Sequence, residues 1–164
     1  MTSAFGGIFV ADGVTAQTVA AAPAKLTCFT TAFGVRGSDA SVVEDANNDQ
    51  VKLRPGVYKA RFNIDFDAPS TLASYQFHLR AGTAVGQALN ELLADVHSRV
   101  DVTLTTDTQC HARASGFFEI TQAMVDQDSS GAGYAAVAIF VELASGASTG
   151  ITVRSAQLTV EKIF

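Results

Sequence analysis

A ten-residue segment with two-residue alternation constrains the fold of this chain more than any other feature of its sequence. Between Val57 and Phe66, one series of alternate positions is apolar or aromatic and the other is polar or charged. The apolar series is Tyr58, Ala60, Phe62, Ile64 and Phe66. Successive side chains of a strand point to opposite faces of a sheet, so the segment predicts a strand with one buried and one solvated face.

The same alternation recurs in two further segments, Tyr75–Arg80 and Ile151–Lys162, and Ala156–Phe164 is predicted as the final strand. A third segment, Ala135–Leu143, is apolar at both sets of positions. It is typical of a central strand covered on both sides, here by a second sheet and a neighbouring subunit. The predicted core residues are Tyr58, Phe62, Ile64, Phe77, Leu158 and Val160.

Turn-forming residues separate these segments at short intervals. Examples are Asp45–Asp49 and Arg54–Gly56, where proline fixes φ and glycine accepts positive φ. Strands at intervals of about 8–12 residues predict an all-β fold, a single jelly-roll sandwich of two antiparallel sheets. One stretch differs: Ala88, Leu89, Leu92, Leu93 and Val96 repeat with helical spacing. We therefore expect a short inserted helix near residues 86–97.

Composition excludes several classes of protein. The chain has 164 residues, which corresponds to one domain, and a net charge of -5 with no basic tract, so we expect no nucleic-acid partner. The longest apolar run, Ala135–Val141, is shorter than the roughly 20 residues of a membrane span, so we expect no membrane partner. Only 16% of residues are charged, against about 25% in a typical domain. This low charge indicates that part of the surface is buried against other subunits.

No motif in the sequence supports catalysis. Gly146–Gly150 matches G-x-S-x-G, but a nucleophile elbow needs a following helix, and a strand pattern follows here. The histidines His78, His97 and His111 are not at zinc-ligand spacing and are expected at the surface or at an interface. No nucleophile, base and orienting group can be combined, so we predict that the protein is not an enzyme and has no catalytic residues.

Two acidic loops carry oxygen ligands of the kind that bind calcium. Asp126–Gly131 begins like a calcium loop but has Val137 where a bidentate glutamate is required, and Asp45–Asp49 has Gln50 where glycine is needed. We therefore expect no metal and no cofactor, with a calcium ion bound by one of these loops as the alternative. Cys28 and Cys110 show no CxxC spacing and are predicted to be buried free thiols.

The stretch Gln17–Phe66 resembles the first half of the jelly rolls of the tumour-necrosis-factor and complement-globular-head superfamily. The matching residues are Thr18-Val19, Lys25-Leu26-Thr27, Asp49 before Val51, and Pro55-Gly56-Val57-Tyr58 with its alternating continuation. The end of the chain, Ser155–Ile163, is similar to the last strand of that superfamily. Domains of this kind also occur in bacteriophage virion proteins, where they form trimers, so the resemblance implies a homotrimer.

These observations favour a structural virion protein, a trimeric cement or decoration protein on the exterior of a phage capsid. Its partner is then the major capsid protein, and it is made in the host cytoplasm. The alternative is the receptor- or glycan-binding tip of a tail fibre, which normally follows a long shaft, whereas this chain enters strand-like sequence by Ile8–Val10. A secreted signalling ligand is disfavoured because Met1–Ala24 contains no Lys or Arg and so lacks the basic start of an export signal.

The N-terminal segment supplies the candidate capsid contacts. We divide the chain into residues 1–24, an N-terminal arm with the first strand, and residues 25–164, the jelly-roll domain. Met1–Ala24 carries only one charge, Asp12. Phe5, Ile8 and Phe9 are too apolar for a free tail, and Gly6-Gly7 is expected to give flexibility to an arm, Met1–Gly7, that reaches a capsid surface.

Overall fold

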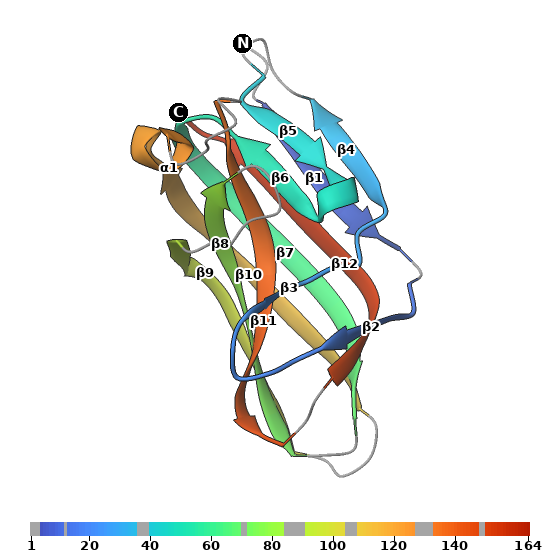
Figure 1. Ribbon diagram of the computed structural model, residues 1–164. Coiled ribbons are helices and arrows are strands. Elements are labelled where there is room, and N and C mark those ends of the chain that lie inside the picture. The colour runs from blue at the N-terminus through green and yellow to red at the C-terminus, as the bar shows by residue number, and fades with distance from the viewer. Residues whose placement is uncertain are drawn as a thin grey trace.

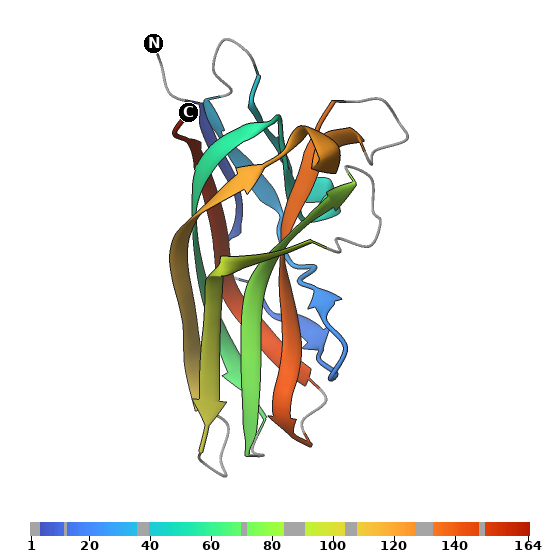
Figure 2. The same cartoon turned by 90° about the vertical axis from the view of Figure 1, so that its left-hand side faces the viewer.

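The computed structural model describes residues 4–11, 13–35, 40–69, 72–83, 91–103, 108–126, 133–147 and 150–164. Within these residues, strands form two antiparallel sheets that face each other and run along the length of the molecule (Figures 1 and 2). The predicted all-β jelly-roll sandwich is confirmed. In the described ranges, two single-turn helical elements accompany the sheets, η1 (Ala46–Asn48) and α1 (Gln122–Asp126).

The first sheet has the order β10-β7-β12-β1-β4, with β2 paired to β12. Its strands are β1 (Phe5–Val10), β2 (Thr15–Thr18), β4 (Thr31–Val35), β7 (Gly56–Ala68), β10 (Thr108–Ile120) and β12 (Gly150–Lys162). The second sheet has the order β5-β6-β11-β8-β9, with β3 paired to β11. Its strands are β3 (Ala24–Lys25), β5 (Val42–Asp45), β6 (Gln50–Leu53), β8 (Ala73–Thr83), β9 (Glu91–Val102) and β11 (Ala135–Gly146).

The core lies between the two sheets, and its centre is the apolar series of β7. All six predicted core residues are completely buried. Phe66 of β7 packs against Tyr75 and Phe77 of β8, with ring centroids 5.8 and 5.2 Å apart. These aromatic contacts join the two sheets, because edge-on and tilted ring pairs add to the energy of burial.

A bulge in β12 changes which of its residues face the core. The pairing of β12 with β7 shifts between Val153 and Ser155. Ile151 and Val153 are buried before the shift, whereas Ala156 and Leu158 are buried after it. An extra residue in one strand reverses the inside–outside phase of everything that follows.

The predicted helix near residues 86–97 is wrong over residues 91–97, which belong to strand β9; residues 86–90 lie outside the described ranges. The reason is an irregularity in the pairing of β9 with β8. His78 pairs with His97, but Leu79 pairs with Leu93, so several residues of β9 are inserted at this point. Leu93 and Val96 are therefore both buried although they are three residues apart. This spacing imitates a helical stripe.

The apolar strand β11 is buried on both faces, as its sequence predicts. Ala136, Ala138 and Phe140 point away from the core between the sheets and are nevertheless buried. Their burial occurs within a single chain. The pattern of β11 therefore does not require a neighbouring subunit, contrary to the interpretation of the sequence.

The two cysteines are buried free thiols. Burial, with a smaller contribution from Asp49, raises the pKa of Cys28 to about 12. Burial also raises the pKa of Cys110. Since the thiolate is the reactive form, we expect both thiols to react slowly with a thiol reagent until the protein is denatured. Thermal unfolding curves with and without reductant are expected to coincide; a disulfide would instead make reduction cost about 2–4 kcal/mol.

Candidate functional site

The side of the first sheet that faces away from the core, hereafter the outer face, carries its polar residues in rows across the strands. One row runs from Arg113 on β10 through Asn63 on β7 and Gln157 on β12 to Phe9 on β1. The adjacent row contains His111, Asp65 and Ser155. The register of four strands that are distant in sequence thus gathers amides, charges and an aromatic ring on one surface.

Asp65 is the centre of the charged part of the outer face. Its carboxylate accepts a hydrogen bond from Ser155 Oγ at 2.7 Å and lies 2.5 Å from His111 Nδ1. The hydrogen bonds from Ser155 and His111 lower the pKa of Asp65. Nearby, Asp67 accepts a hydrogen bond from Arg154 Nε at 2.6 Å. The carboxylates of Asp65 and Asp67 are therefore both held by side chains of the neighbouring strands β10 and β12.

Ser155, His111 and Asp65 do not have the geometry of a catalytic triad. In a triad the histidine accepts the proton of the serine and the carboxylate orients the histidine. Here the Ser155 hydroxyl donates to Asp65. The arrangement neutralises and orients charges, and it leaves Ser155 without the histidine contact that would activate it as a nucleophile.

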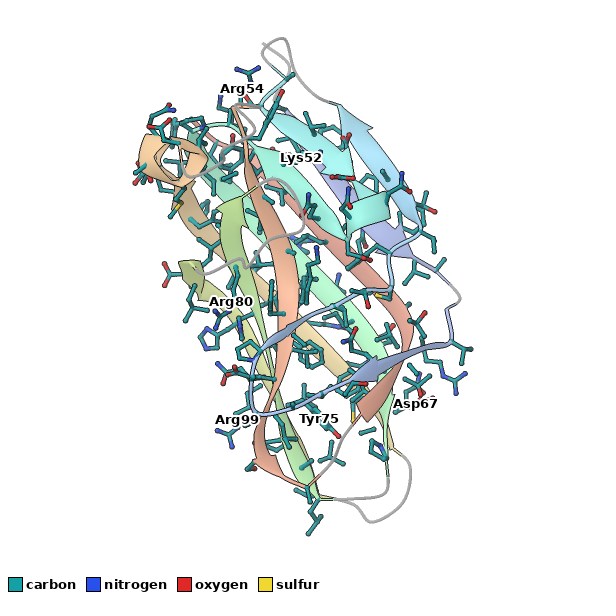
Figure 3. All side chains as sticks on the ribbon, in the orientation of Figure 1. Lys52, Arg54, Asp67, Tyr75, Arg80 and Arg99 are labelled. Carbon is teal, nitrogen blue, oxygen red and sulfur yellow. The ribbon has the colours of Figure 1, made fainter. Side chains whose placement is uncertain are left out.

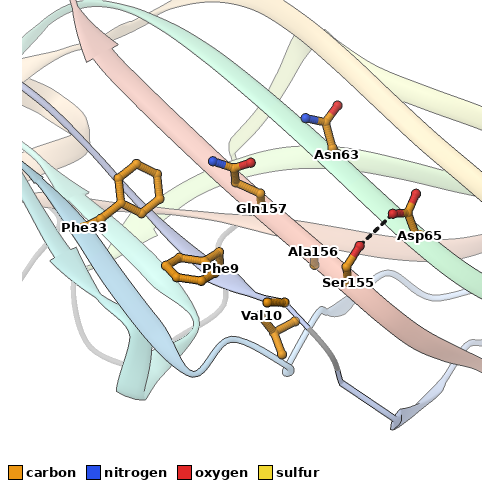
Figure 4. A pocket seen from close by; sticks show the side chains of 9 residues that line it. Phe9, Val10, Phe33, Asn63, Asp65, Ser155, Ala156 and Gln157 are labelled. Carbon is orange, nitrogen blue, oxygen red and sulfur yellow. Dashed lines mark hydrogen bonds between the residues drawn. The ribbon is translucent and has the colours of Figure 1, made fainter.

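A hollow of about 520 Å³ lies beside this cluster, on the β1 and β12 side of the outer face. One wall is aromatic, with Phe9 and Phe33 in edge contact at 5.8 Å between centroids. The opposite side carries Asn63, Asp65, Ser155 and Gln157 (Figure 4). Gly7 has no side chain to occupy the space taken by the Phe33 ring. The hollow combines an apolar wall with several polar groups, the mixture found in binding sites.

The opposite border of the outer face presents a large apolar side chain. Phe117 on β10 is 56% exposed. Lys59 on β7 places its ammonium 5.7 Å from the centroid of the Phe117 ring. An exposed phenylalanine held by a cation–π contact is a rigid projection of the surface. The outer face therefore has an aromatic projection at one border and an aromatic-lined hollow at the other.

The three predicted capsid contacts have different positions in the structure. Phe5 is 38% exposed, and Phe9 is partly buried in the hollow. Ile8 is completely buried in the core, so it is not available as a contact, contrary to the sequence interpretation. Gly6 and Gly7 are buried within β1, which pairs with β12 on one side and β4 on the other. Residues 5–7 are therefore part of the sheet and not a flexible arm; Met1–Ser3 lie outside the described residues.

The carboxylates of the acidic loop Asp45–Asp49 already have hydrogen-bond and ion-pair partners within the protein. The Asp45 carboxylate accepts hydrogen bonds from Asn48 and Gln50 and pairs with Lys52 at 2.9 Å. Burial raises the pKa of Asp45, but these hydrogen bonds outweigh burial and lower it. Asp49 accepts a hydrogen bond from the Phe29 amide at 2.9 Å. Within the described ranges, no three His, Cys, Asp or Glu side chains are grouped as metal ligands would be.

Two further motifs fall largely outside the described residues. These are the centre of the G-x-S-x-G match, at residues 148–149, and the second candidate calcium loop, at residues 127–132. In the part of the chain that the structure does describe, neither helix is long and apolar enough to cross a bilayer.

Comparison with known proteins relates the chain to other proteins through its fold. No protein-family model and no curated protein matches the sequence. Among solved structures, it is similar to Eiger TNF from S. frugiperda, with a TM-score of 0.59 and 13% identity over 98% of this chain and 94% of that one. It is also similar to murine APRIL at pH 5.0, with a TM-score of 0.56 and 11% identity over 99% of this chain and all of that one. The chain therefore has the jelly-roll fold of tumour-necrosis-factor-like structures.

Proposed function

We propose that this protein is a non-enzymatic structural protein that assembles as a homotrimer and decorates the exterior of a bacteriophage capsid. The observation that supports a homotrimer is the presence of two complementary features at opposite borders of the outer face. Phe117 projects from the β10 border, and the hollow of Phe9 and Phe33 lies toward the β1 and β4 border.

Such a face suits a closed ring of copies. In a cyclic assembly each contact joins two different patches, so the β10 border of one copy meets the β1 border of the next. Phe117 of one copy then fills the hollow of its neighbour, and burial of an exposed aromatic ring is favourable. The low charge of the chain, 16%, agrees with a surface that is partly covered.

The capsid role is supported by the resemblance of the sequence to the tumour-necrosis-factor and complement-globular-head superfamily, whose domains also occur in trimeric bacteriophage virion proteins. It is also supported by Phe5, an exposed aromatic residue at the start of β1. Three copies of this side chain in one trimer would contact a symmetric lattice together, and several weak contacts give an avid attachment.

The assembly is tested with Phe117→Arg and a matched control, Phe164→Ala. Phe164 is 82% exposed and is not part of the hollow. We expect light scattering to give three times the 17.1 kDa chain mass for the wild type and the control, and one chain mass for Phe117→Arg. A wild-type mass of one chain at all concentrations would exclude the trimer. A trimeric Phe117→Arg would exclude this contact.

The capsid role is tested separately with Phe5→Ser. Electron microscopy of capsids incubated with each variant measures occupancy of the outer surface. We expect full decoration by the wild type and reduced decoration by a Phe5→Ser protein that remains trimeric. Absence of wild-type decoration would contradict the capsid role, and full decoration by Phe5→Ser would place the contact elsewhere.

A second candidate, the glycan-binding tip of a tail fibre, is favoured by the chemistry of the hollow. Sugars stack their C–H faces on aromatic rings and bond their hydroxyls to amides and carboxylates. Phe9, Asn63 and Gln157 offer these groups around a volume of about 520 Å³. Binding of an oligosaccharide by the wild type, lost in Gln157→Ala with unchanged assembly, would favour this function over decoration.

A further inference from the structure

A buried histidine lies on the side of the second sheet that faces away from the core. The sequence predicts His78 at the surface or an interface, on the polar face of its strand; the face is correct, but His78 is only 2% exposed. Its ring stacks on Phe140 of β11, with centroids 6.4 Å apart and an angle of 12° between the planes. The Arg80 guanidinium covers the same Phe140 ring at 5.7 Å. We refer to His78, Arg80 and Phe140 as the His78 cluster.

The hydrogen bonding of His78 fixes its neutral form. Arg80 Nε donates to His78 Nε2 at 2.9 Å. Because a guanidinium does not lose its proton in proteins, Nε2 must be the acceptor, and the neutral ring carries its proton on Nδ1. Within the described part of the chain, the buried Nδ1 has no hydrogen-bond partner. The ring is thus held by one hydrogen bond that only its neutral form can accept.

Protonation is incompatible with this arrangement. A proton on Nε2 would face the Arg80 N–H, so two donors would meet and the hydrogen bond would be lost. The new charge would also be buried next to a cation. Burial first, then Arg80 and His97, lower the pKa of His78 to about 4 from its ordinary value of 6.5.

The other charged groups on this side of the sheet do not offer a counter-ion directly opposite His78. Its neighbours across the strands are His97 on β9 and Phe140 on β11. Lys25 of β3 lies opposite Phe140. Arg99 of β9 and Glu142 of β11 both lie opposite Gln76, the next residue of this face along β8. Figure 3 labels Arg80, on β8, and Arg99, on the edge strand β9.

The His78 cluster is next to a structural weak point. β9 is the edge strand of the second sheet, and its pairing with β8 is interrupted immediately after His78–His97. Where a ladder is interrupted, fewer hydrogen bonds hold the edge strand. On the β9 side His78 faces His97, so a charge on His78 is repelled by a charge on His97 across the β8–β9 ladder, at the point where this ladder is interrupted.

We propose that the His78 cluster is an acid-sensitive switch that keeps the β8–β9 edge closed while His78 is neutral and opens this edge when His78 is protonated. The direction follows from linkage. Since the folded-state pKa is lower than the unfolded one, the closed state is fully favoured above pH 6.5 and loses this advantage as pH falls from 6.5 to about 4. Over this window the opening constant is expected to rise by about two to three orders of magnitude.

The carboxylates act at lower pH or in the opposite direction. Asp45, Asp65 and Asp101 have pKa values lowered from 3.8, so their stabilising contributions are lost only below that value. Burial raises the pKa of Asp49, and protonation of that group favours the folded state. A loss of protection between pH 6.5 and 4 that is absent from His78→Gln therefore identifies His78.

The test is hydrogen–deuterium exchange of the full chain from pH 7.5 to 4, corrected for intrinsic exchange rates. The variant is His78→Gln, whose amide oxygen accepts a hydrogen bond from Arg80 without titrating, and the control is His111→Gln. We expect the wild type and the control to lose protection in β8 and β9 by about 100-fold or more toward pH 4, with β7 and β12 unchanged. His78→Gln is expected to keep its protection.

Equal loss of protection in His78→Gln and the wild type would overturn the proposal, as would a wild type with unchanged β8 and β9. A second measurement needs no variant. An NMR titration of the wild-type histidines is expected to show one ring that remains neutral to about pH 4. If the His78 resonance titrates near its ordinary value of 6.5, the proposal is wrong even when the glutamine variant does not fold.

Discussion

Replacing Phe62 by alanine is expected to lower the free energy of unfolding by about 3–5 kcal/mol, the range for a large buried aromatic side chain. Phe62 has no exposed surface and lies at the middle of β7, which pairs with β10 and β12. Both neighbouring strands hold the backbone of β7 in place, so the cavity cannot close by movement of the strand. Urea denaturation measures the change as a shift in midpoint at constant slope.

The control for Phe62 is the same substitution at Phe164. Its side chain is 82% exposed, so its removal is expected to change stability by less than about 0.5 kcal/mol. A Phe62→Ala loss below 1 kcal/mol would mean that the inward face of β7 is assigned incorrectly. Equal effects at the two positions would mean that burial does not determine the cost.

Replacing Gly7 by alanine is expected to destabilise the protein by about 1–3 kcal/mol, the usual cost of overpacking a filled site. A methyl group at this position would overlap the backbone oxygen of Leu158 and lie 2.8 Å from Cζ of Phe33. The Leu158 oxygen belongs to β12, the neighbour of β1 in the sheet, and cannot move without displacing that strand. Phe33 would also be forced out of its place on the wall of the hollow.

The matched control is Gly150→Ala. A methyl group there meets only the Gln17 backbone oxygen, at 3.3 Å instead of the overlap with the Leu158 oxygen at Gly7, so we expect a much smaller loss of stability than for Gly7→Ala. Thermal unfolding of both variants gives the comparison. If Gly7→Ala were as stable as the control, Gly7 would be a flexible position after all, as the sequence suggests, and β1 would not be packed between β12 and β4.

The alternation of β7 could be predicted from the sequence because it depends only on residues that are close together along the chain. A two-residue period specifies the strand and its buried face together, and an uninterrupted ladder preserves that phase over the whole length of β7. The sandwich follows from several such strands separated by turns. The resemblance in Gln17–Phe66 then indicated which kind of sandwich, and the solved structures agree with it.

Strand β9 and His78 show where local information is insufficient. The spacing of Leu93 and Val96 fits a helix, and only the irregular pairing with β8 shows why both are buried in a strand. Likewise His78 occupies a polar position by alternation, yet it is buried by Phe140, which is 62 residues away in the sequence. Inserted residues and stacking between distant strands leave no periodic signal.

The sequence by itself determined the regularly alternating strands such as β7, the predicted core residues and the two-sheet architecture, because burial of one strand face imposes a period that can be read locally. Which residues lie together on the outer face was decided by the tertiary structure alone. Asp65, His111 and Ser155 come from β7, β10 and β12, and Phe9 and Phe33 come from β1 and β4. Their proximity depends on strand order and register, which are set by the packing of the whole sandwich and not by any one segment.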